Sequence, residues 1–147
     1  MKLIGLRNTS TQTVDVDGLV NIGTVYRKNT VKDCCGIMTF SNDSTSISLN
    51  HKGIYHITVT AIVSAPVAGD VTLSLFANGV EIPGALGTET ITTATTEFHT
   101  LTIDTYVLVN NSNILGIWET SPVNLTLVNT GVASIISNVV VNTTKEV

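Results

Sequence analysis

The residues best suited to acid–base or metal chemistry are three histidines, His51, His56 and His99, and two adjacent cysteines, Cys34 and Cys35. No histidine combines with another, or with the cysteine pair, into a zinc-ligand pattern. His56 alternates with the apolar residues of a predicted strand and His51 lies in a predicted turn, so both are interpreted as structural. A disulfide between adjacent cysteines closes a strained eight-membered ring, which favours reduced thiols.

Carboxylates offer two further kinds of site. Asp15-x-Asp17-Gly18 is similar to the start of a calcium loop, but the other oxygen ligands and the distal Glu are missing, so a plain turn is favoured. Asp104 and Glu119 are predicted on strands, and two carboxylates flanking a sugar can hydrolyse a glycosidic bond. Their separation in space does not follow from the sequence, so that alternative stays open. No nucleophile elbow, phosphate-binding loop or dinucleotide fingerprint occurs, and we predict no enzymatic activity, no cofactor and no metal site.

The elements that would position such groups are all predicted strands. Thr, Val and Ile number 24, 19 and 14 among 147 residues, and these β-branched side chains suit pleated strands. Residues 53–80, GIYHITVTAIVSAPVAGDVTLSLFANGV, predict two long strands joined at a Pro/Gly turn, which we interpret as the central hairpin of the fold. Apolar residues alternate along the first strand, and Asn78-Gly79 is a strong turn dipeptide that ends the second.

The rest of the chain supplies the other strands. Residues 1–18 predict an N-terminal arm or edge strand, a possible docking segment. The basic stretch 27–33 is interpreted as a solvated loop, with contact to an anionic surface as the alternative. The glycines and proline of 81–88 predict an exposed loop. Strands are predicted at 19–26, 36–40, 45–49, 98–109, 114–119, 123–128 and 133–141, before a frayed tail at 142–147. We therefore predict an all-β jelly-roll sandwich of about 8–10 antiparallel strands over residues 19–141.

Composition restricts the partners. Only 12% of the residues are charged and the net charge is −4, too little basic character to neutralise a run of phosphates, so no nucleic acid is expected. No apolar stretch approaches the roughly 20 residues of a membrane helix, so no membrane partner is expected. An uncharged, Thr-rich surface is typical of proteins that bury it against other subunits, which favours an oligomer or a larger assembly.

Three stretches, GIYHITV, VTLSLFANGVEI and ILGIWE, resemble the jelly-roll domain shared by the complement globular heads and the tumour necrosis factor family. The matching positions are the Gly-x-Tyr of Gly53 and Tyr55, the Asn78-Gly79 turn, Trp118, and a closing strand at 134–141. With Thr/Asn-rich strands and few aromatics, the chain is most similar to bacteriophage and bacterial members. The resemblance implies a homotrimer around a threefold axis. The chain departs from relatives in lacking a collagen-like or coiled stalk and an evident set of calcium-binding carboxylates.

The resemblance implies a non-enzymatic structural protein of a virion, a trimeric capsid-decoration (auxiliary head) or fibre-tip protein. It would assemble in the host cytoplasm and contact the major capsid or other virion proteins. The alternative is a trimeric bacterial surface or spore-coat recognition head that binds a protein or glycan through loops such as 81–88. Large anchors, in the core or the subunit interface, are predicted at Tyr55, Ile57, Val59, Trp118 and Ile136.

Overall fold

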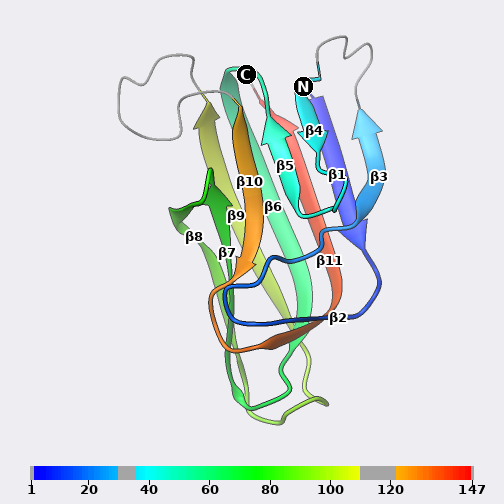
Figure 1. The fold of residues 1–147 in the computed structure, drawn as a ribbon, viewed down its shortest axis with the longest axis vertical. Coiled ribbons are helices and arrows are strands. Elements are labelled where there is room, and N and C mark those ends of the chain that lie inside the picture. Colours follow the sequence, from blue (N-terminus) through cyan, green and yellow to red (C-terminus); the bar gives the residue numbers. More distant parts are fainter. Residues whose placement is uncertain (1, 30–35, 110–121, 147) are drawn as a thin grey trace.

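Two antiparallel β-sheets packed face to face make up the chain in a computed structural model that describes residues 2–29, 36–109 and 122–146 (Figure 1). The first sheet has the order β3-β1-β11-β6-β9, with β2 paired to one end of β11. Its strands are β1 (Lys2–Asn8), β2 (Gln12–Val14), β3 (Thr24–Asn29), β6 (Gly53–Ser64), β9 (His99–Val109) and β11 (Ser134–Lys145). The second sheet has the order β4-β5-β10-β7-β8. Its strands are β4 (Met38–Phe40), β5 (Ser46–Leu49), β7 (Gly69–Ala77), β8 (Val80–Ile91) and β10 (Val123–Asn129).

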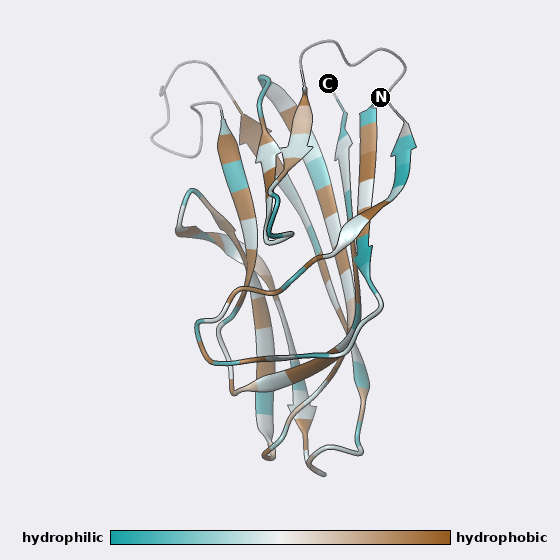
Figure 2. Cartoon of the chain, turned by 45° about the vertical axis from the view of Figure 1, so that its right-hand side comes forward, coloured by the Kyte–Doolittle hydropathy of each residue, from teal (hydrophilic) through white to brown (hydrophobic). Residues whose placement is uncertain are grey.

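The core lies between the sheets because nearly every strand presents alternate apolar residues to the other sheet. Figure 2 shows this as alternating hydrophobic and hydrophilic bands along the strands. Along β6, Tyr55, Ile57 and Val59 are buried, and Leu73 of β7 and Leu125 of β10 belong to the same core from the second sheet. The predicted all-β sandwich is therefore confirmed, with eleven strands in the described parts of the chain.

Several local predictions are also confirmed. Strands occupy most of 45–49, 98–109 and 123–128, as the alternation predicts. Asn78 and Gly79 form the two-residue turn between β7 and β8, with φ angles of 51° and 79°. Two consecutive positive φ angles are what a type I′ hairpin turn requires, and Asn-Gly adopts them at low cost.

The prediction that the two strands of residues 53–80 pair as a hairpin is wrong. β6 pairs with β9 and β11 in the first sheet, whereas β7 pairs with β8 and β10 in the second. The segment between them therefore crosses the end of the sandwich, and Ala65 at its start is fully buried. Alternation reports which face of a strand is buried but not which strand is its hydrogen-bonded neighbour, so two strands facing each other across a core look like a hairpin.

The predicted exposed loop at 81–88 is also wrong, because these residues form part of β8. Ile82 and Ala85 are buried against the core. β8 is the edge strand of its sheet, so no strand pairs with its solvent side. A proline such as Pro83 therefore costs no hydrogen bond of the sheet on that side. The ladder with β7 shifts register between Ser74 and Phe76, and Gly84 has a φ of 78°. A bulge at the sheet edge thus accommodates the Pro-Gly pair that predicts a loop.

The first part of the predicted N-terminal arm or edge strand, β1, is an inner strand, and only β2, which pairs with β11 alone, lies at an edge. β1 lies between β3 and β11, and its Ile4 and Leu6 are buried. After β2 the chain crosses to the second sheet, where the Val20 N–H donates to the Leu127 carbonyl (2.9 Å). It returns as β3, so the strand predicted at 19–26 begins at Thr24. The polar residues after β1 gave no sign that β1 itself is an inner strand.

The C-terminal residues do not fray within the described part of the chain. β11 continues to Lys145, with β1 on one side and β6 on the other, so the predicted tail at 142–147 is strand over most of its length. The pairing of Lys2 with Lys145 also places the start of β1 and the end of β11 at one end of the sandwich. Polar Asn and Thr residues predict a frayed end, but the two neighbouring strands satisfy the backbone of β11 whatever its side chains are.

Candidate interaction surface

The outer face of the first sheet, on β6 and β9, exposes large apolar side chains that pair across the two strands. Ile54 lies opposite Leu108, and the two are 39% and 46% exposed. Tyr106, 59% exposed, lies one pair further along, and Ile62, 36% exposed, lies near the other end of β6. Four large apolar residues exposed on two adjacent strands are unusual for the solvent-facing side of a sheet. Such patches mark sites of contact with another molecule.

His56 sits at the centre of a polar and aromatic cluster on this face. Its Nε2 lies 2.6 Å from Oδ1 of Asp104 on β9, and its Nδ1 lies 3.9 Å from Oε1 of Glu146. The imidazole stacks on the Tyr106 ring, with centroids 4.5 Å apart and planes at 13°. The cluster stacks the two rings on each other and keeps the Asp104 carboxylate, 68% exposed, in a defined place.

A second cluster lies on the same face at the opposite edge of the sheet. The Tyr26 hydroxyl donates to Oδ1 of Asn142 (2.9 Å), so the ring crosses over Gly5. A Cβ at Gly5 would come within 2.8 Å of that ring, which is why only glycine fits beneath it. The guanidinium carbons of Arg7 and Arg27 lie 5.3 and 5.5 Å from the ring centroid, in the range of a cation–π contact. Two exposed guanidinium groups are thereby gathered around one aromatic ring.

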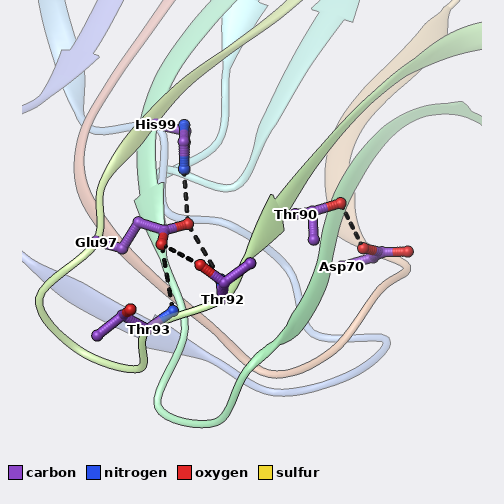
Figure 3. Close-up of polar contacts among 6 residues, drawn as sticks. All are labelled: Asp70, Thr90, Thr92, Thr93, Glu97 and His99. Carbon is purple, nitrogen blue, oxygen red and sulfur yellow. Dashed lines mark hydrogen bonds and ion pairs between the residues drawn. The ribbon is translucent and has the colours of Figure 1, made fainter.

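A third polar cluster lies in the loop between β8 and β9 (Figure 3). Glu97 accepts hydrogen bonds from the Thr92 hydroxyl (2.6 Å) and from the Thr92 and Thr93 N–H groups (3.0 and 3.2 Å). Its carboxylate also lies 2.8 Å from Nε2 of His99. The Thr92 hydrogen bonds, followed by that of His99, lower the pKa of Glu97 to about 2. Glu97 therefore acts as an internal cap that shapes the loop, and its acceptors point into the chain.

Four of the five predicted anchors lie in the sandwich core. Tyr55, Ile57, Val59 and Ile136 are at most 1% exposed. The Tyr55 hydroxyl donates to the His51 carbonyl (2.7 Å), which satisfies its polar end. None of the four reaches the outer face of the first sheet. Trp118 lies outside the described residues, as do Glu119 and the two cysteines.

The outer face therefore brings together residues that the sequence shows only separately. His56, Asp104 and Tyr106 meet because β6 and β9 are neighbours, and Tyr26 reaches Asn142 because β3, β1 and β11 are neighbours. No sequence signal indicates these contacts, since each depends on pairing between strands far apart in the chain. The alternation did place His56 on the face opposite Tyr55, and the structure agrees.

Within the described residues, no hydroxyl or thiol group hydrogen-bonds to His56, as an activated nucleophile would require. No group of three or more metal-ligating side chains occurs there either. Within the same residues, no helix is long and apolar enough to cross a membrane.

The sequence matches no known protein family and no curated protein. Solved structures, however, share the two-sheet arrangement. The globular domain of zebrafish complement 1qA protein is 7% identical, with a TM-score of 0.66, over 100% of this chain and 98% of that one. The Eiger TNF of S. frugiperda is 12% identical, with a TM-score of 0.64, over 100% and 94%. The chain has the jelly-roll fold of these proteins.

The same jelly roll is found in a bacteriophage protein. PRD1 vertex protein P5 is 17% identical to this chain, with a TM-score of 0.55, over 98% of this chain and 96% of that one. The jelly roll predicted from the Gly-x-Tyr and Asn-Gly positions is therefore confirmed as a fold. At these identities the similarity describes the arrangement of strands and carries no residue roles.

Proposed function

We propose that this jelly-roll protein is a non-enzymatic structural protein of a virion, a homotrimer that decorates the capsid or tips a fibre through protein–protein contacts. The observation that carries the proposal is the outer face of the first sheet. It exposes Ile54, Tyr106 and Leu108 next to one another, although a free-standing sandwich gains nothing by leaving them in water. A second copy of the same chain would cover them.

The virion part of the proposal is supported by the similarity to the vertex protein of PRD1 and by the resemblance to bacteriophage members noted in the sequence. A weakly charged, Thr-rich chain also suits a protein whose surface is shared with many neighbouring copies. Major capsid or other virion proteins are the expected partners. The face that meets them would lie away from the apolar strip on β6 and β9.

The first experiment measures the mass of the purified protein in solution by light scattering. A species near three times the 15.5 kDa of the chain is expected. A monomer at micromolar concentration would contradict the trimer. Deleting residues 1–18 is not a suitable test of docking, because the deletion removes β1 from the middle of its sheet.

The second experiment tests the virion assignment independently of the trimer. Antibodies against the protein should label virus particles purified from the host that carries the gene, and the label should resist washing of the particles. Labelling of the bacterial or spore surface without labelling of particles would instead favour the recognition head. A trimer that labels neither would overturn the virion proposal while leaving the assembly intact.

A further inference from the structure

One cross-strand row on the outer face of the first sheet runs from an acidic end to a basic end. In this row, each residue lies directly opposite the next on the neighbouring strand: Asp104 of β9, Thr58 of β6, Asn142 of β11, Gly5 of β1 and Arg27 of β3. Four inter-strand spacings of about 4.8 Å separate the ends of the row by about 19 Å. Asp104 and Arg27 thus lie at about the same height along the strands, on opposite edges of the sheet.

Negative and positive side chains lie towards opposite edges of the first sheet. β9 contains one carboxylate, Asp104, and no lysine or arginine. β1 and β3 contain lysines and arginines but no carboxylate. Each charged end is also held in place from within the chain, Asp104 by His56 and the two guanidinium groups by Tyr26. Groups that are exposed but already ordered lose little conformational entropy when a partner binds them.

A closed ring of identical copies brings two different patches of the chain together at every interface. Rotation about the ring axis leaves the height of each residue along that axis unchanged. If the axis runs along the strands, only groups at similar heights on opposite edges can meet. We infer that Asp104 of each copy pairs with the Arg7–Tyr26–Arg27 cluster of the next copy around the ring. This inference rests on the proposed homotrimer and specifies which surfaces join.

The pairing would mainly set the orientation in which neighbouring copies join. An exposed ion pair contributes little to affinity, but a carboxylate that two guanidinium groups can reach forms stronger, directional hydrogen bonds when neighbouring apolar residues exclude water. Like charges brought together in a wrong arrangement are repelled. The apolar strip of Ile54, Tyr106 and Leu108 would supply the affinity. The row of charges would select the head-to-tail direction in which the copies join.

Charge reversal followed by rescue tests the inference. Asp104→Arg should raise the protein concentration at half-dissociation, measured by sedimentation velocity, by about tenfold or more. The double variant Arg7→Asp/Arg27→Asp should do the same. Combining all three substitutions in one chain restores opposite charges at each interface and should bring the value back to within about threefold of wild type.

Two further variants separate charge from folding. Glu81→Arg makes the same charge change on β8 of the second sheet and should leave association unchanged. Asp104→Asn keeps an acceptor for His56 but removes the charge, so it should weaken association even if Asp104→Arg proves unstable in thermal melts. The effect of Asp104→Asn should also shrink as salt is raised, because ions screen the lost attraction.

The outcomes distinguish the inference from the function on which it rests. A wild-type monomer would overturn both. A wild-type trimer that tolerates Asp104→Arg and Asp104→Asn, or that is not rescued by the combined substitutions, would overturn the pairing and leave the trimer standing. A wild-type dimer would overturn the ring arrangement. Two copies packed face to face can bring the Asp104 edge of one beside the arginine edge of the other without forming a closed ring.

Discussion

The two sheets of this sandwich present outer faces of different kinds. On the second sheet, polar side chains hydrogen-bond to one another across strands: Ser48 with Asn124 (2.5 Å), Thr72 with Thr88 (2.8 Å), and Thr90 with Asp70 (2.8 Å). On the first sheet, β6 and β9 expose apolar pairs, and charges collect at the two edges. The second sheet satisfies these polar groups within the chain and exposes apolar residues such as Leu86 on its edge strand, whereas on the first sheet the exposed apolar residues lie next to one another on β6 and β9. The difference teaches that burial within one chain does not explain every residue of the first sheet.

Buried Asn129 ties the two sheets together. Its amide donates to the carbonyls of Val14 (2.9 Å) and Val132 (2.9 Å), on segments leading to and from the first sheet. Asn129→Ala leaves these carbonyls without their donor, so we expect a loss of about 2–4 kcal/mol in unfolding free energy. Chemical denaturation measures this. The exposed Asn124→Ala should lose less than about 1 kcal/mol, and equal losses would contradict the assigned role of Asn129.

Two leucines of nearly equal exposure test the difference between the faces directly. Leu108 on the first sheet is 46% exposed, and Leu86 on the second is 45% exposed. Leu108→Asp places a charge in the strip that a second copy would cover, so it should weaken self-association about tenfold or more, as a substitution at an interface centre does. Leu86→Asp should not change association. Sedimentation velocity measures both, and equal effects would remove the distinction between the faces.

Glu97, in the loop between β8 and β9, should make the stability of the fold depend on pH. Thr92 and then His99 hold the pKa of Glu97 at about 2, below the ordinary 4.5. Because the folded-state pKa is lowered, ionised Glu97 stabilises the fold above pH 4.5, and this contribution is lost as the pH falls from 4.5 towards 2. Glu97→Gln should therefore lower the melting temperature at neutral pH, with a gap to wild type that narrows over that range in calorimetry. A gap independent of pH would contradict the role of the carboxylate.

The sequence predicts the burial of individual residues much better than their neighbours. Alternation identifies Tyr55 and Ile57 as facing one side of a strand and His56 as facing the other, and this holds in the structure. It does not reveal that β6 and β7 lie in different sheets, because both strands face the same core. The outer-face clusters were missed for the same reason. The pairing of Asp104 with His56, or of Tyr26 with Asn142, depends on a register that long-range packing sets.

The smallest expected effects concern single hydroxyl groups on the two faces. Thr72→Val removes the cross-strand hydrogen bond to Thr88 on the second sheet, so the unfolding free energy should fall by about 0.5 kcal/mol, with no change in mass in solution. Thr60→Val is the matched change on the first sheet, opposite Val140. It extends the apolar surface between Ile62 and His56, so association should be as tight as wild type or tighter. Weaker association of Thr60→Val would indicate that water, and not a second copy, normally covers that face.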